Sequence, residues 1–158
     1  MIRGELRPDY GNIHVDRISV VEQTRKGQMY IGVCPQEDAV DNLTVQQTLT
    51  FYASVKGLRN VQSNITQVLT ALDIVQFKNH EHRALSGGTK RKLTVAIALL
   101  GNPQLLLLDE PSTGQDAGAK RVLWQALRRV SKDRAILLTT HSMEEAEALA
   151  SKVAIIST

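Results

Sequence analysis

The chain has 158 residues and a formal net charge of +3, and 42% of its residues are hydrophobic. This length and composition suit a single domain with its own core. No apolar run approaches the roughly 18 residues of a membrane-spanning helix, so we expect a globular domain with no transmembrane segment in this chain. Cys34 is the only cysteine, which excludes an internal disulfide and is typical of a small buried side chain.

The first residues predict a helix end, a turn and a strand. Met1 to Leu6 has the pattern of the last turn of a helix, and Pro8-Asp9-Tyr10-Gly11 is a turn sequence. Apolar residues then alternate around Ile13, Val15 and Ile18, which predicts a strand.

A strand from Met29 to Val33 and two helices are expected next. Thr44 and Gln47 form a capping box before the first helix, and Gly57 ends it. The second helix is expected after Ser63, because its apolar residues share one helical face.

The polar clusters of the chain have two possible meanings. The histidines of His80-Glu81-His82 could share a metal on a strand, but the segment looks helical or irregular, which favours solvated side chains. Lys90-Arg91-Lys92 is expected to be a solvated basic face. The same expectation holds for a second basic group, which comprises Arg128, Arg129, Lys132 and Arg134.

Leu85-Ser86-Gly87-Gly88-Thr89 is the first stretch that indicates chemistry. It opens an apolar-faced helix that is expected from about Gly88 to Leu100 and that Gly101-Asn102-Pro103 stops. Two glycines let a ligand approach the main chain closely, and the free N–H groups of a helix N-terminus bind anions. The stretch therefore predicts a phosphate contact.

The second stretch is an apolar run that ends in acids. Gln104 and four leucines precede Asp109 and Glu110, which predicts a buried parallel strand. In open α/β sheets, ligands bind beyond the carboxyl ends of the strands. Two carboxylates at that edge suggest a cation and a water near phosphate, so the two stretches together predict a nucleotide site.

The last third predicts a helix, a buried strand, a short helix and a further strand. The first helix, from Ala119 to Val130, is amphipathic, and Ala135 to Thr140 is an apolar strand with His141 at its carboxyl end. Ser142 is expected to cap the next helix, and Val153 to Ile156 has a strand pattern.

Five motifs in order resemble those of an ATP-binding cassette (ABC) ATPase. The Q-loop, signature, Walker B, D-loop and H-loop of that family are matched respectively by Cys34-Pro35-Gln36, Ser86-Gly87-Gly88, Leu105 to Pro111, Ser112 to Asp116, and His141. Finer features resemble the subfamily A lipid transporters; they include Gly32 to Gln36, Leu43-Thr44-Val45, Lys90 to Leu93, and His141 to Leu149.

The resemblance implies an α/β fold. It has a P-loop NTPase-like ABC ATPase core with a mainly parallel sheet, plus a small α-helical subdomain. The chain is then a single partial nucleotide-binding domain. Residues 1–36 are expected to be core with the Q-loop, residues 37–88 the helical subdomain, and residues 89–158 core with Walker B, D-loop and H-loop.

The resemblance also implies roles at the strand ends. Glu110 would be the general base, Asp109 would orient Mg²⁺, and Gln36 would reach the metal and the attacking water. His141 would contact the γ-phosphate. Adjacent residues on an extended strand point opposite ways, so Asp109 and Glu110 are expected to take separate roles.

A second set of residues would serve a partner. In the family, Ser86-Gly87-Gly88 contacts the γ-phosphate of ATP held by a second cassette in a head-to-tail dimer, and Asp116 is the D-loop acid. Thr89 stands where glutamine is usual. Gln115 replaces an apolar residue and is expected to alter packing across the dimer interface.

The implied activity is ATP hydrolysis with Mg²⁺, which powers transport across a membrane. The expected partners are a second cassette and transmembrane domains, the expected substrate is lipid, and the expected location is the cytoplasmic face of a membrane. No P-loop string, G-x-x-x-x-G-K-[ST], occurs in the sequence. We therefore expect a chain that is truncated at its front and that has little or no ATPase activity alone. The remaining strands of the family's cassette would follow Thr158, so we expect truncation at the back as well.

Two alternatives remain open. One is a soluble ABC ATPase that acts on nucleic acid or ribosomes through the basic faces, although the segment between Gln36 and Ser86 has no heptads for the long coiled coil of the DNA-acting members, and no nucleic-acid partner is expected. The other is a non-catalytic partner half of a composite ATP site.

Overall fold

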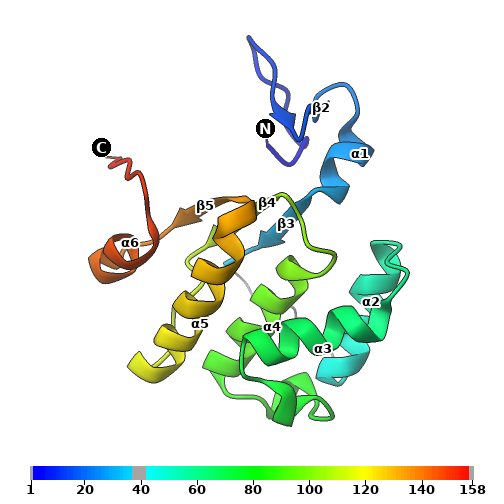
Figure 1. The fold of residues 1–158 in the computed structure, drawn as a ribbon, viewed down its shortest axis with the longest axis vertical. Coiled ribbons are helices and arrows are strands. Elements are labelled where there is room, and N and C mark those ends of the chain that lie inside the picture. Colours follow the sequence, from blue (N-terminus) through cyan, green and yellow to red (C-terminus); the bar gives the residue numbers. More distant parts are fainter. Residues whose placement is uncertain (1, 37–41, 157–158) are drawn as a thin grey trace.

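A parallel sheet of three strands runs through the centre of the molecule. The structure, a computed structural model, describes residues 2–36 and 42–156. The strands lie in the order β3 (Ile31–Cys34), β4 (Leu105–Asp109) and β5 (Ala135–Thr139), as Figure 1 shows. Cys34 pairs with Leu108, and Asp109 pairs with Thr139, so the carboxyl ends of all three strands meet at one edge. The predicted α/β class and parallel sheet are confirmed.

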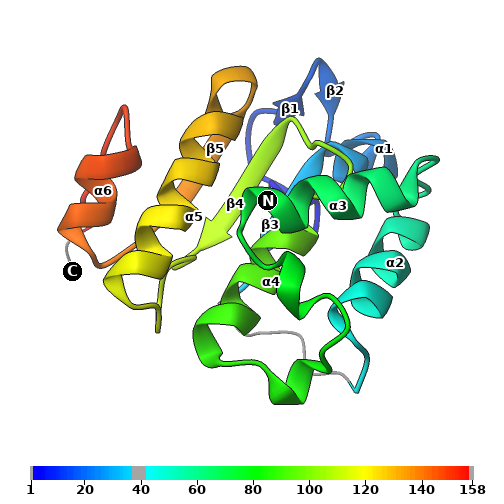
Figure 2. The same cartoon turned by 60° about the horizontal axis from the view of Figure 1, so that its bottom comes forward.

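The helices follow in chain order, and α4 and α5 lie on the same face of the sheet (Figure 2). They are α1 (Thr24–Met29), α2 (Val45–Val55), α3 (Val61–Ala71), α4 (Gly87–Leu99), α5 (Ala117–Val130) and α6 (Met143–Leu149). Short 3-10 turns join them: η1 (Val75–Phe77), η2 (His82–Ala84) and η3 (Ser131–Asp133). Within the described residues, no helix has the length and apolar character that crossing a membrane requires.

The two faces of the sheet are covered unequally. Leu106 and Leu108 are 0% and 2% exposed and belong to the main hydrophobic core, to which α2 to α5 also contribute. Leu105 and Leu107 point to the other face and are only half-buried, because their cluster contains just a few residues from the N-terminal region and β3. Leu137 of β5 is 53% exposed. The expectation of fully buried strands is therefore wrong for this second face.

The helical segment between β3 and α4 begins as the sequence predicts. Thr44 accepts a hydrogen bond from Gln47 N at 3.2 Å, and Thr44 N donates to Gln47 Oε1 at 2.9 Å, which is the expected capping box. Gly57 ends the helix with a φ of +67°. The next helix starts at Val61, two residues before Ser63. The division at residues 37–88 stays a prediction, and residues 37–41 lie outside the described part.

The N-terminal predictions need two corrections. The described part of Met1 to Leu6 forms turns rather than a helix end, because Gly4 takes a left-handed φ of +77° that interrupts any helix. The single strand expected near Ile13 to Ile18 is instead an antiparallel hairpin of β1 (His14–Val15) and β2 (Ile18–Ser19). Its turn residues both have positive φ, as two-residue hairpins require.

Two C-terminal boundaries also differ from the prediction. The helix expected from Ala119 begins at Ala117, because the Asp116 side chain caps it. Val153 to Ile156 is not a strand: Val153, Ile155 and Ile156 are 64%, 86% and 95% exposed. A strand needs a hydrogen-bonded neighbour, and none of the described strands pairs with these residues.

Candidate functional site

The Glu110 carboxylate is the centre of a polar group at the carboxyl end of β4. It accepts a hydrogen bond from Thr113 Oγ1 at 2.9 Å, and its other oxygen lies 3.1 Å from His141 Nδ1. The bond from His141, followed by the one from Thr113, lowers the pKa of Glu110 below its ordinary value. The side chain is therefore a positioned, ionised carboxylate at neutral pH.

Asp109 has a separate partner. Its carboxylate accepts a hydrogen bond from Thr139 Oγ1 on the neighbouring strand β5. The two acids thus make different contacts, but the expected reason is wrong: Glu110 has a φ of +46° and lies in a turn after β4, not on an extended strand. That turn is what directs the Glu110 side chain toward Thr113 and His141.

Gln36 reaches the same sheet edge from β3. Its main-chain oxygen and that of Glu110 both accept hydrogen bonds from one guanidinium, that of Arg91, so the two strand ends are close in space. Gln36 and Asp109 are exposed. An exposed carboxylate and an amide suit Mg²⁺, which binds through one or two protein oxygens together with phosphate and water. No three metal-binding side chains cluster in the described residues, so these two would form only part of its shell.

The signature residues begin α4. Ser86 is the N-cap: its hydroxyl accepts from Thr89 N at 3.3 Å and lies 2.9 Å from Thr89 Oγ1. Apart from its chain neighbours and the main chain of its own helix, no described atom lies within 4 Å of the position that a Cβ on Gly87 would occupy. A Cβ on Gly88 would lie 3.6 Å from Gln115 Cγ. The Gly87 side of the helix start is therefore open to a ligand.

The D-loop residues lie against this helix start. Gln115 is 8% exposed and donates from Nε2 to Pro111 O at 3.1 Å, so it packs within the chain. Asp116 caps α5 through a hydrogen bond from Ala119 N at 2.9 Å, which is the main cause of its lowered pKa. The signature and D-loop residues thus form a second polar group, distinct from the one around Glu110.

Arg91 is the residue that sequence reasoning missed. The expected solvated basic face is wrong for Arg91 and Lys92, which are 4% and 8% exposed. Arg91 donates to main-chain oxygens of both strand ends. Its spacing to Val95 and Ala98, four and seven residues on, places it on the buried face of α4, and that spacing was the available signal. The expectation holds better for Arg128 and Arg129, which are exposed.

The histidine cluster is only partly solvated. His80 is exposed and packs edge-on against Phe77. His82 is 5% exposed, so the expectation of a solvated side chain is wrong for it. Its main-chain N–H donates to Leu43 O and fixes the segment against the start of the α2 region.

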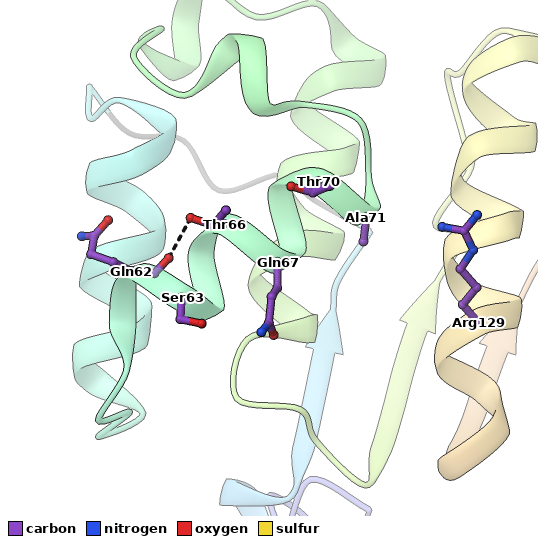
Figure 3. Close-up of a pocket in the computed structure, with 7 residues that line it drawn as sticks. All are labelled: Gln62, Ser63, Thr66, Gln67, Thr70, Ala71 and Arg129. Atoms are coloured by element: carbon purple, nitrogen blue, oxygen red, sulfur yellow. Dashed lines mark hydrogen bonds between the residues drawn. The ribbon is translucent and has the colours of Figure 1, made fainter.

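A shallow pocket of 630 Å³ lies away from these groups. Figure 3 shows that polar side chains of α3 line one side, with Arg129 of α5 on the other. Its lining consists of Gln62, Ser63, Thr66, Gln67, Thr70, Ala71 and Arg129. It contains no acid and none of the motif residues, so the candidate site is the open sheet edge and not this pocket.

Comparisons with known proteins agree with the geometry. A sequence profile described as ABC transporter matches residues 1–113. The chain is 40% identical over 151 residues to the cholesterol transporter ABCA5 of Mus musculus, and the match covers 94% of this chain and 9% of that protein. It is 41% identical over 160 residues to the glucosylceramide transporter ABCA12 of Homo sapiens, covering 98% of this chain and 6% of that protein. It is also 37% identical over 160 residues to the phospholipid-transporting ATPase ABCA3 of Rattus norvegicus, and this match covers 99% of this chain and 9% of that protein.

Solved structures show the same fold. The ATP-binding subunit of an ABC transporter aligns with a TM-score of 0.79 at 24% identity, over 92% of this chain and 62% of that chain. A dimeric ATP-binding cassette in a post-hydrolysis state, MJ0796 bound to ADP and Pi, aligns with a TM-score of 0.80 at 21% identity. The alignment covers 93% of this chain and 69% of that chain. The chain spans less than a tenth of the length of the curated relatives named above. From the profile and these relatives, the chain belongs to the ABC transporter family.

Proposed function

We propose that the chain is part of an ATP-binding cassette that works in a head-to-tail pair to power the transport of lipids across a membrane. The support for ATP is the family and the arrangement of Glu110, Asp109 and His141 at one sheet edge. The support for lipids is that the named relatives are transporters of cholesterol, glucosylceramide and phospholipid. The chain would then work at the cytoplasmic face of a membrane, against transmembrane domains.

The Glu110 contact with His141 carries the proposal. Glu110 would act as the general base for the attacking water, because its carboxylate is ionised at neutral pH and so can accept a proton. His141 holds that carboxylate and would contact the γ-phosphate. Asp109 and Gln36 would hold Mg²⁺, which supplies neutralisation of phosphate charge when bound.

The signature group would serve the partner's nucleotide. Ser86, Gly87 and Gly88 present a capped helix start with open space at Gly87, which suits an anion. Asp116 fixes the start of α5 beside it. In a head-to-tail pair, this group faces ATP that the second cassette holds.

A silent half of a composite site is the second candidate. The chain has a signature group but no P-loop string to hold phosphates beside its own Glu110. We therefore propose that these 158 residues alone hydrolyse little or no ATP. Action on nucleic acid has less support, because Arg91 and Lys92 are buried and Arg134 donates to Asn102 and Pro103 within the chain.

ATP hydrolysis by a mixture of this chain with a complete cassette tests the proposal. The mixture should hydrolyse ATP faster than the complete cassette alone. Ser86→Arg in this chain should abolish that added turnover, because the arginine side chain blocks the helix start that serves the partner's nucleotide. Glu110→Gln should leave the turnover of this mixture unchanged, because the general-base role of Glu110 needs phosphates held beside it, and these 158 residues contain no P-loop string to hold them. Magnesium-dependent turnover by the chain alone that Glu110→Gln removes would overturn the claim that the chain alone is inactive.

A further inference from the structure

The Arg91 side chain connects three segments that are far apart in the sequence. It belongs to α4, and it donates hydrogen bonds to four main-chain carbonyl oxygens at the ends of β3 and β4. Those oxygens belong to Pro35, Gln36, Asp109 and Glu110. Charge-assisted hydrogen bonds are stronger than neutral ones, so a buried guanidinium with these contacts fixes the segments to each other.

The planar guanidinium of Arg91 donates hydrogen bonds from both of its edges. Nη1 lies 2.5 Å from Pro35 O and 3.2 Å from Gln36 O, on the β3 side. Nε and Nη2 lie 3.2 Å and 3.1 Å from Glu110 O, on the β4 side. A lysine ammonium carries its donors on one atom and has no such fork.

We propose that Arg91 is a positioning residue that makes the main chain at Gln36 and Glu110 follow the signature helix α4. Arg91 lies little more than one turn after Ser86, so a shift of the helix start moves the guanidinium and the carbonyls that it holds. That a nucleotide bound at the start of α4 acts on the two strand ends through Arg91 rests on the proposed function. The positioning of the two strand ends by Arg91 rests on the hydrogen bonds alone.

Cys34 provides a built-in reporter for this contact. It is the only cysteine, it is 1% exposed, and it directly precedes Pro35, whose carbonyl Arg91 holds. A thiol reagent reaches it only when the end of β3 opens, so the labelling rate measures local opening there.

The first experiment measures Cys34 labelling in the chain alone. Arg91→Met removes every donor but keeps the length of the side chain, and Arg91→Lys keeps the charge. Lys56→Met is the matched control, because Lys56 donates to Ile97 O and Leu100 O at the far end of the same helix. Rates are compared at urea concentrations that give each variant the same global stability.

We expect Arg91→Met to raise the rate of Cys34 labelling about tenfold, because the end of β3 opens more often when its carbonyls lose their hydrogen bonds to Arg91. The rate of Arg91→Lys should lie between those of Arg91→Met and the wild type. The Lys56→Met rate should match the wild type. Equal rates for the Arg91 and Lys56 variants would overturn the proposal. If Arg91→Met does not fold, the comparison of Arg91→Lys with Lys56→Met decides.

The second experiment adds a cysteine-free complete cassette and ATP. ATP should change the Cys34 labelling rate of the wild type, and Arg91→Lys should lose that change while ATP still binds the mixture. Persistence of the change in Arg91→Lys would overturn the coupling. Absence of ATP binding by the wild-type mixture would instead contradict the proposed function and leave the result with the chain alone intact.

Discussion

The Glu110 carboxylate and the His141 imidazole, 31 residues apart in the sequence, lie 3.1 Å from each other at the ends of neighbouring strands. The side chain of His141 is 75% exposed and that of Glu110 only 26% exposed. Of the two, the acid is therefore the more enclosed side chain.

Substitution of His141 by alanine should raise the pKa of Glu110 toward its ordinary value. The hydrogen bond from His141 is the largest cause of the lowered pKa. Carboxyl ¹³C NMR during an acid titration measures the change. Thr113→Val removes the second contributor and should give a smaller rise in the same direction. An unchanged Glu110 titration in His141→Ala would contradict the assigned contact.

The cap at Asp116 should make stability depend on pH. The folded-state pKa of Asp116 is lower than its ordinary value of 3.8, so its ionised form stabilises the native state above that pH. That stabilisation is lost as the pH falls through the folded-state pKa. Asp116→Asn keeps a capping oxygen without titrating, so its stability deficit, measured by urea unfolding, should shrink from pH 6 to pH 3. A stability difference between Asp116→Asn and the wild type that stays constant from pH 6 to pH 3 would show that the charge of Asp116 does not stabilise the native state.

Two glycine substitutions should separate packing from ligand contact. A Cβ on Gly32 would lie 2.1 Å from Ala98 O of α4, so Gly32→Ala should cost about 3 kcal/mol of stability or prevent folding. Gly87→Ala should change the free energy of unfolding by less than about 1 kcal/mol, because its site is open.

The same Gly87→Ala variant should nevertheless weaken ATP binding by a mixture with a complete cassette. Urea unfolding and nucleotide titration of the two variants check the pair of expectations. Normal stability of Gly32→Ala would disprove the close approach of α4 to β3. Unchanged ATP binding by Gly87→Ala would count against the signature role.

The capping box of α2 should contribute measurably to stability. Thr44→Ala removes the hydroxyl that accepts from Gln47 N and should cost about 1 kcal/mol in urea unfolding. Thr66→Ala is the control, because that exposed hydroxyl only donates to Gln62 O within α3 and caps nothing. Equal losses of unfolding free energy in Thr44→Ala and Thr66→Ala would mean that the capping box does not stabilise the chain.

The sequence predicted the parts of the fold that are encoded locally. The leucine run of β4, the cap at Ser86 and the box at Thr44 each depend on a few neighbouring residues. The structure confirms the strand, the cap and the box, although only one face of β4 is fully buried. Strand ends that carry polar side chains also indicated that Asp109 and His141 would lie at one edge.

The parts that were not predicted depend on distant contacts. Arg91 is buried because carbonyls 18 to 56 residues away accept its hydrogen bonds, and no local pattern reports such partners. The positive φ of Glu110 and the lack of a strand at Val153 to Ile156 likewise reflect the tertiary surroundings. A periodic pattern tells which side chains share a face, but it does not tell what that face meets.

The decisive measurement is a titration of Mg-ATP, first with the purified chain alone and then with the chain mixed with a complete cassette. We expect no binding by the chain alone at cellular nucleotide concentrations. We expect the mixture to bind Mg-ATP more tightly than the cassette alone, and Ser86→Arg to remove this gain. Saturable binding of Mg-ATP by the chain alone would contradict this account.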